Sequence, residues 1–319
     1  MAKLKDKVQD ALDENRMMVL GVQVLIGFDY RAVFEKGFEW LPRAAQLWKL
    51  GSLSVLLVTF ALLIAPGADH RIAEEGEDSS WFHRYTTTFA ALALCPFAVA
   101  MGIDLAIACV RVTGPAGAVA AGAAIAVVAL VMWYGVELLF RPDKARRERM
   151  KARDQQQDGE KTDVRHKIRH ALTEARVVLP GAQALLGFQF VTMLMEGFDK
   201  LPPALKWLHL GALGCIAVAI ILLITPAAWH RIVERGEETE RMHKLATAMI
   251  VAALVPIALG LSADFFVVAY KVTKSAAIAG GLSGGALALF AALWFGVTLA
   301  RRSASASETT ASSAARAPA

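Results

Sequence analysis

Apolar residues of this chain fall into long, nearly unbroken runs, and polar residues gather in the short segments between them. Runs of this length predict helices that cross a membrane, because about 20 apolar residues span the hydrocarbon core of a bilayer. The strict alternation of a barrel strand is absent, so we expect helices. The predicted spans are residues 17–41, 50–66, 89–110, 116–140, 177–201, 208–226, 245–270 and 276–300. The pattern therefore predicts an all-α polytopic membrane protein with eight transmembrane helices.

The second half of the chain repeats the first at an offset of 160 residues. The string APGADHRIAEEGE at 65–77 returns as TPAAWHRIVERGE at 225–237, and the alignment runs without a gap from Leu12 to Thr113. Self-similarity of this kind indicates duplication of a structural unit, here one with four predicted spans. An even number of spans makes both copies enter from the same side. We therefore expect two parallel repeats related by a pseudo-twofold axis along the membrane normal.

The repeat divides the chain into five parts. We expect a cytoplasmic amphipathic N-terminus (1–15), a first four-helix membrane repeat (16–141), a charged cytoplasmic linker (142–170), a second four-helix membrane repeat (171–302) and a disordered tail (303–319).

Composition supports a protein in lipid and the distribution of charge gives its orientation. Hydrophobic residues make up 56% of the chain, charged residues 20%, and the mean hydropathy is +0.45. The formal net charge of +5 reflects basic residues near both ends and in the linker. By the positive-inside rule these segments face the cytoplasm, which predicts that both termini are cytoplasmic; the bacterial inner membrane is the location implied by the family resemblance given below. The lipid bilayer is the expected partner, a nucleic acid is not, and a homo-oligomer remains open.

Asp104 and Asp264 are the leading candidates for a functional site. They occupy equivalent positions of the two repeats, in the apolar stretches AVAMGIDLAIACV and ALGLSADFFVVAY. A carboxylate inside a membrane helix costs at least about 2.5–3.5 kcal/mol and so faces a cavity or a partner. Two interpretations stay open: a site for a proton or monovalent cation, or a structural hydrogen bond to a neighbouring helix or to Thr113 and Thr273. Asp29 is set aside because its counterpart is Gln189.

A second group of polar residues lies at the predicted cytoplasmic ends of the helices. Pro66 and Pro226 are expected to open a new helix, on which His70, Glu74 and Glu77 share a face. The group is either an interfacial ion-pair network or a gate that responds to pH, since histidine titrates near neutrality. Its members in the two repeats are His70, Arg71, Glu74, Glu14 and Arg16, and His230, Arg231, Glu234, Glu174 and Arg176.

Other polar and proline residues kept in both repeats are expected to serve helix packing. Gln23 and Gln183 lie one turn before a glycine, where an amide can hydrogen-bond across a close helix contact. Pro96 and Pro256 interrupt the helices that carry the two aspartates, and each removes one helical hydrogen bond.

Sequence patterns of soluble enzymes are absent. The chain has no phosphate-binding loop, no dinucleotide glycine pattern, no nucleophile elbow and no zinc-protease helix, so we expect no enzyme, no catalytic residue and no cofactor. The three cysteines lie inside apolar runs without the spacing of metal ligands, and no metal site is predicted.

The stretches ALTEARVVLPGAQALLGFQF (171–190) and LLITPAAWHRIVERGEE (222–238) resemble a family of small four-helix bacterial integral membrane proteins of unknown function. The shared features are a Glu-x-Arg entry, a Pro-Gly-x-Gln-x-Leu first helix and a Pro-x-x-x-His-Arg end to the second. The resemblance covers the second repeat and, more loosely, the first, where Leu20 stands in place of Pro180. Members are sometimes labelled sodium:proton antiporters, and the resemblance carries over no catalytic residue.

Two functions of different classes follow. The first is transport or conduction of a small cation or proton along the interface of the repeats, with Asp104 and Asp264 facing the ion. The second is a structural or regulatory membrane protein in which the same acids hold helices together. A hydrated cavity at the acids would favour the first, and fully packed acids the second.

Overall fold

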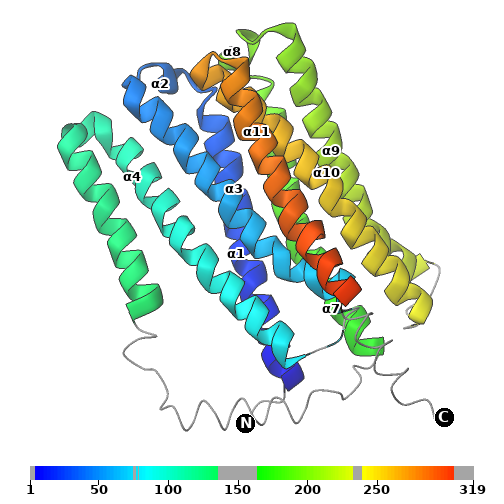
Figure 1. Cartoon of the computed structure of the whole chain (residues 1–319). Coiled ribbons are helices and arrows are strands. Elements are labelled where there is room, and N and C mark those ends of the chain that lie inside the picture. Colours follow the sequence, from blue (N-terminus) through cyan, green and yellow to red (C-terminus); the bar gives the residue numbers. More distant parts are fainter. Residues whose placement is uncertain (1–3, 75–76, 78, 136–163, 233–238, 305–319) are drawn as a thin grey trace, which may run out of the picture.

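The computed structural model describes residues 4–74, 77, 79–135, 164–232 and 239–304, and every element of regular structure in them is helical. Figure 1 shows a bundle of long helices joined by short turns. The first half contains α1 (Leu4–Ala32), α2 (Lys36–Glu39), α3 (Arg43–Ile72), α4 (Ser80–Leu130) and the π-helix η1 (Val131–Gly135). The second half contains α7 (Val164–Thr192), α8 (Glu196–Asp199), α9 (Pro203–Ile232), α10 (Glu240–Thr273), α11 (Ala276–Ala291) and the π-helix η2 (Ala292–Gly296).

Helix α4 is two arms that fold back on each other at Gly114. Gly114 has φ 73° and ψ 176°, a conformation that suits glycine because it has no Cβ. The arms lie antiparallel in Figure 1. The second half turns at the equivalent position, between α10 and α11, where Lys274 has φ 58°. Both halves therefore consist of a long helix, a short helix and three further long segments in the same order.

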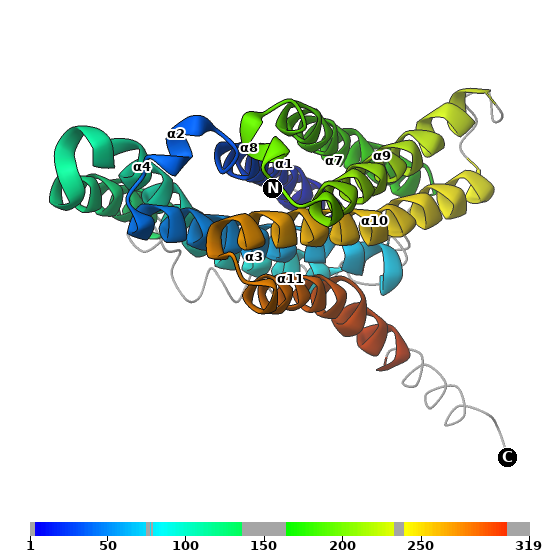
Figure 2. The same ribbon diagram turned by 90° about the horizontal axis from the view of Figure 1, so that it is seen from above.

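The first long helices of the two halves, α1 and α7, pack side by side and run in the same direction (Figures 1 and 2). Their contact is close: a Cβ on Gly27 would lie 2.1 Å from the ring of Phe188, and one on Gly181 would lie 1.7 Å from the amide of Gln23. At the end of the molecule that carries α2 and α8, Lys36 forms an ion pair of 2.6 Å with Glu196. These two residues occupy equivalent positions, so the pair joins matching points of the two halves.

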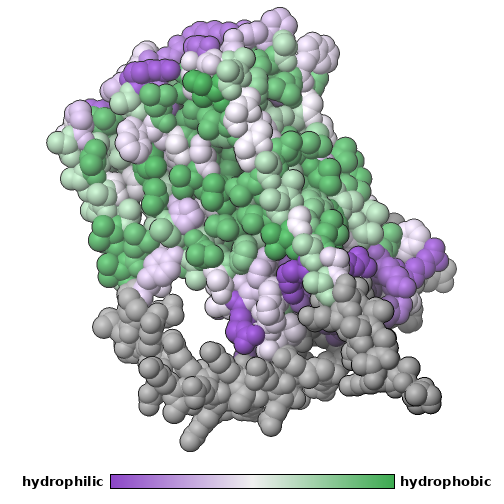
Figure 3. Space-filling view, in the orientation of Figure 1, coloured by the Kyte–Doolittle hydropathy of each residue, from purple (hydrophilic) through white to green (hydrophobic). Residues whose placement is uncertain are grey.

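The surface carries a broad apolar belt between two polar ends (Figure 3). Five helices of the described residues are long and apolar enough to cross a membrane: Arg43–Ile72, Ser80–Tyr134, Pro203–His230, Glu240–Thr273 and Ala276–Ala304. The sequence pattern predicted eight spans. The difference has two causes. Both arms of α4 lie in one 55-residue helix. Helices α1 and α7 are charged over their first halves, and α1 also carries Asp29 and Arg31 near its end.

The last helices of the two halves are placed differently, which departs from the expected twofold symmetry. The second arm of α4 lies at the outer edge of the bundle (Figure 1), whereas α11 and η2 pack on α3 of the other half. There the indole N–H of Trp294 donates to the carbonyl of Ala61 at 3.0 Å, and its ring meets Phe60. One residue is inserted before this point of the second half, so Trp294 matches Trp133 at an offset of 161. Trp133 stacks instead on Phe97 of its own half. Trp294 of η2 therefore packs across the two halves, whereas Trp133 of η1 packs within its own.

Pro66 and Pro226 do not open new helices, contrary to the prediction. Both lie inside long helices, α3 and α9, and Pro96 and Pro256 likewise lie inside α4 and α10. A membrane helix tolerates an internal proline because neighbouring helices and local adjustments satisfy the freed carbonyl. Since α3 ends at Ile72, the expected helical face of His70, Glu74 and Glu77 does not form.

Candidate functional site: two buried acid clusters

Asp104 lies in a buried cluster with two residues of neighbouring helices, Asp29 of α1 and Lys49 of α3. The Lys49 ammonium donates to Asp104 Oδ1 at 2.9 Å and to Asp29 Oδ1 at shorter range. Asp29 is 3% exposed and Lys49 9%, whereas the Asp104 side chain is 20% exposed, so the cluster is buried in the first half on the side of Asp29 and partly open at Asp104. We call Asp29, Lys49 and Asp104 the first acid cluster.

Asp264 lies in an equivalent cluster of the second half, with Gln189 of α7 and His209 of α9. Asp264 Oδ1 is 2.8 Å from His209 Nδ1, and the Gln189 amide donates to Oδ2 at 2.5 Å. Tyr30 of α1 reaches in from the first half, with its hydroxyl 2.7 Å from the same nitrogen of His209. We call Gln189, His209, Asp264 and Tyr30 the second acid cluster. It lies at the buried interface between the halves.

The two clusters use the same positions of the repeat. Asp29, Lys49 and Asp104 are each followed 160 residues later by Gln189, His209 and Asp264. Identity is kept only at the aspartates, while the other positions keep a hydrogen-bonding group and a basic group. Lys49 and His209 were missed in the sequence, and Asp29 was set aside, because only identical pairs were considered. A search for pairs of the same chemical kind would have found all three.

One interpretation of the sequence made Thr113 and Thr273 hydrogen-bond partners of the aspartates, and the structure shows that they are not. Their hydroxyls donate to carbonyls of their own helices, at Cys109 and Ala269, in the way that threonine commonly does one turn back along a helix.

Each acid cluster becomes neutral when it holds one exchangeable proton. In the first, two carboxylates face one ammonium. In the second, one carboxylate faces an imidazole, which carries a charge only when protonated. An uncompensated negative charge away from water is unfavourable by several kcal/mol. The composition of both clusters is therefore suited to binding one proton or another monovalent cation.

Each cluster also leaves one buried oxygen unpaired, at the same position of the repeat. Asp29 Oδ2 and Gln189 Oε1 have no hydrogen-bond partner among the described residues. An unpaired buried acceptor costs about 1–3 kcal/mol, so these oxygens mark where a water or cation would be stabilised.

Two small cavities lie along the interface between the halves. We call the one nearer α2 and α8 the upper cavity and the other the lower cavity. The upper cavity has a volume of about 20 Å³ and is lined by Ile26, Gly27, Tyr30, Gln189 and Asp264 among others. The lower cavity has a volume of about 30 Å³ and is lined by Leu12, Asn15, Arg16 and Val19 among others. Each has room for one or two waters, since a single water needs about 10–15 Å³.

Gln23 lies between the two cavities on α1. It is completely buried, and neither its Nε2 nor its Oε1 has a hydrogen-bond partner in the described part of the chain. At 1.5 Å rise per residue along α1, it is about 6 Å from Val19 of the lower cavity and about 4.5 Å from Ile26 of the upper one. Polar groups therefore follow the surface between the halves from Asp264 to Arg16.

Arg16, His70 and their neighbours gather at the end of the bundle opposite α2 and α8. Arg16 forms an ion pair with Asp13 and donates to the carbonyl of His170 at 3.2 Å, which joins α1 to α7. His70 is fully buried and stacks on Phe82 at 4.5 Å between ring centroids. This part of the predicted cytoplasmic cluster is thus brought together between the two halves.

Arg301 provides a link at this end that the sequence did not suggest. Its guanidinium pairs with the fully buried Asp69, and with Glu74 at 2.8 Å. It also lies 3.3 Å from the ring centroid of Trp81. The counterpart of Asp69 is Trp229, so the repeat gave no signal for this contact.

The remaining predicted residues are more dispersed. Arg71 is buried, His230 is partly buried on α9, and Glu14 and Gln183 are exposed, so Gln183 does not reproduce the contact of Gln23. The side chains of Glu174, Arg176 and Arg231, and the whole of Glu234, lie outside the described residues. Among the residues that the structure describes, no group of three or more His, Cys, Asp or Glu side chains could hold a metal ion.

These features describe an all-helical protein in which five helices of the described residues are long and apolar enough to cross a membrane, with an acid cluster in each half. The chain belongs to the family of unknown function DUF6328, whose model matches residues 2–137 and again residues 157–298. The two successive matches agree with a duplicated family unit. No curated protein and no solved structure matches the chain.

Proposed function

We propose that the protein carries a proton, or another monovalent cation, across a membrane along the surface between its two repeats. In this proposal all eight long helical segments cross the bilayer, the two arms of α4 counting as two. The N-terminal ends of α1 and α7, together with Arg301 and Arg302 after η2, face the cytoplasm of a bacterial cell. The second acid cluster binds the ion, and His70 and Arg16 lie near the cytoplasmic exit. No enzymatic step is involved.

The observation that carries the proposal is the line of buried polar groups between the halves. Asp264 borders the upper cavity, Gln23 lies midway and Arg16 borders the lower cavity. Buried, ionisable groups at a helix interface inside a membrane protein commonly mark ion or proton pathways. A proton is favoured over a larger ion because the cavity at Asp264 holds about one water and its neighbours, His209 and Tyr30, are proton donors and acceptors.

Gln23→Met tests the pathway. Methionine has a similar length but cannot hydrogen-bond to water, so we expect proton flux to fall by about tenfold, in line with the loss of about 1–2 kcal/mol of hydrogen bonding. Flux is measured in vesicles that contain the full chain and a pH-sensitive dye, after a potassium diffusion potential is imposed. Gln183→Met is the matched control, because Gln183 occupies the equivalent position but is exposed, and its flux should equal that of the parent.

Equal flux from the Gln23→Met and parent proteins would remove the surface between the repeats from the pathway. A parent protein without flux above that of empty vesicles would contradict transport itself.

A second candidate is a structural or regulatory membrane protein, in which the clusters only hold helices together. It is favoured by one observation: each aspartate of the two clusters has a basic partner within hydrogen-bond distance. This candidate predicts that Gln23→Met, which removes an unpaired buried amide, stabilises the protein and changes no flux.

A further inference from the structure

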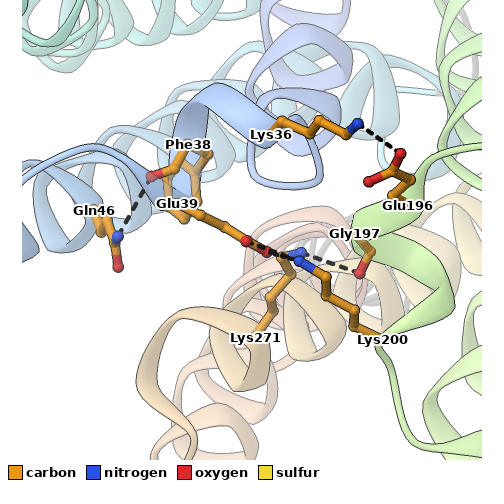
Figure 4. Close-up of polar contacts among 8 residues, drawn as sticks. All are labelled: Lys36, Phe38, Glu39, Gln46, Glu196, Gly197, Lys200 and Lys271. Atoms are coloured by element: carbon orange, nitrogen blue, oxygen red, sulfur yellow. Dashed lines mark hydrogen bonds and ion pairs between the residues drawn. The ribbon is translucent and has the colours of Figure 1, made fainter.

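A hollow of about 220 Å³ opens at the α2 and α8 end, where the two halves meet. Figure 4 shows part of its polar lining, including Glu39, Gln46, Lys200 and Lys271. Its volume is many times the 10–15 Å³ that one water needs, so it has room for a polyatomic ligand. The hollow is formed by α2, the start of α3, α8 and the end of α10. Its polar lining consists of Glu39, Arg43, Gln46, Lys200, Lys271 and Lys274.

The lining carries four positive charges and one negative charge. Glu39 accepts hydrogen bonds from Lys200 at 2.8 and 3.0 Å, and this contact lowers the pKa of Glu39 below its usual range. That pair leaves Arg43, Lys271 and Lys274 without a carboxylate partner in the part of the chain that the structure describes. The hollow therefore has an excess of three positive charges.

Lys271 lines the hollow and is a buried cation, with 9% of its surface exposed. Its ammonium donates to the carbonyl of Gly197 at 3.1 Å and lies 4.8 Å from the ring centroid of Phe34. An ammonium has three donors, so two remain for a ligand or water. Gly197 is required here, because a Cβ on it would lie 2.4 Å from the Phe34 carbonyl oxygen and 2.6 Å from the ammonium.

Lys274 stands in a backbone conformation that disfavours it. Its φ is 58°, whereas the equivalent residue of the first half, with φ 73°, is Gly114. The left-handed conformation costs a residue with a Cβ about 1–2 kcal/mol. The second half therefore has a lysine at a position where the first half has a glycine, which adopts a positive φ without this cost.

Arg43 is likewise at an unfavourable position for a cation. It is the first residue of α3, and the partial positive charge of a helix N-terminus repels cations and attracts anions. Helix-dipole effects account for Lys271 at the end of α10 but not for Arg43.

From this hollow we infer a binding site for an anion that bears a phosphate group, either a free phosphate compound or the headgroup of an anionic lipid. Guanidinium and ammonium groups bind phosphate oxygens through short, charge-assisted hydrogen bonds. Arg43, Lys271 and Lys274 would supply three such donors from three elements, α3, α10 and the turn after it. A ligand held by them would also bridge the two halves, since α3 belongs to the first and α10 to the second.

The residues at the positions equivalent to the three cations do not reproduce the site, which supplies a control. The counterparts of Arg43, Lys271 and Lys274 are Pro203, Arg111 and Gly114. Arg111 lies 5.6 Å from the ring centroid of Trp40, on the outside of the bundle. Loss of Arg111 removes one positive charge from the same end of the molecule, as loss of Arg43 or of Lys274 does, but Arg111 does not line the hollow.

The test compares the parent with the double variant Arg43→Gln/Lys274→Gly, in which glycine at 274 suits the backbone and protects folding. One arm titrates the full chain in a zwitterionic detergent with sodium phosphate, against sodium chloride of equal ionic strength, by calorimetry. A second arm counts bound phosphatidylglycerol by native mass spectrometry in doped micelles, against phosphatidylcholine. Arg111→Gln serves as the control in both arms.

We expect the parent and Arg111→Gln to bind at least one of the two probes, and the double variant to bind it at least about tenfold more weakly, since loss of two charge-assisted contacts exceeds 1.4 kcal/mol. Binding in the first arm identifies a free anion, and binding only in the second identifies a lipid headgroup. Equal binding by the double variant and the parent, or no binding in either arm, would overturn the inference. Neither outcome depends on proton flux, so the result is independent of the proposed transport.

Discussion

Asp264→Asn is expected to reduce proton flux in reconstituted vesicles by at least about a hundredfold, to the level of empty vesicles. Asparagine keeps the size of the side chain and its contacts with Gln189 and His209 but cannot exchange a proton. Removal of a positioned group that transfers protons commonly slows such a step by about 10²–10⁴-fold. The measurement is dye-reported acidification under an imposed potassium diffusion potential.

Asp199→Asn is the control for Asp264→Asn, because Asp199 is an exposed carboxylate of α8 and its loss changes the net charge equally. Its flux should match that of the parent. Undiminished flux through folded Asp264→Asn protein would exclude the second acid cluster from the mechanism.

Lys49→Met is expected to lower the free energy of unfolding by about 3–5 kcal/mol, the usual cost of removing one partner of a buried ion pair. Lys49 is the only positive charge among the described residues that bonds to Asp29 and Asp104, so its loss leaves two carboxylates facing each other without a counterion. The measurement is denaturant unfolding of the protein in mixed micelles, followed by circular dichroism.

The triple variant Lys49→Met/Asp29→Asn/Asp104→Asn separates loss of charge balance from loss of packing. With both carboxylates neutralised, most of the lost stability should return. A Lys49→Met protein as stable as the parent, or a triple variant as unstable as the single one, would show that the first acid cluster is not held by its charges.

The apolar runs and the repeat allowed much of the architecture to be inferred from the sequence. A run such as 50–66 lies within α3, and the one at 245–270 within α10, because an apolar stretch in lipid must satisfy its backbone hydrogen bonds internally. The family model matches the chain twice, in agreement with the duplication. The positions of Asp104 and Asp264 inside apolar helices marked both acid clusters, although not their composition.

The other features of the fold and of the candidate site could not be predicted, because they depend on contacts that differ between the two repeats. Tyr30 reaches the second acid cluster from the other half, and its counterpart Phe190 has no hydroxyl to do the same. Trp294 and Trp133 are equivalent in sequence, but only the first packs across the halves. Gln23 and Gln183 are also equivalent in sequence, but the packed helices bury Gln23 and leave Gln183 exposed. A duplicated chain can specialise its two copies by small differences that show only when the helices are packed.

The most direct test of the account is whether Asp264 gains and loses a proton while the protein stays folded. Infrared difference spectroscopy of the full chain in lipid, recorded as the pH is changed, reports the carbonyl band of a protonated carboxyl group and the paired bands of its ionised form. We predict a titrating carboxyl signal in the parent that is missing from Asp264→Asn and present in Asp199→Asn. An identical set of titrating bands in Asp264→Asn and the parent would contradict the account.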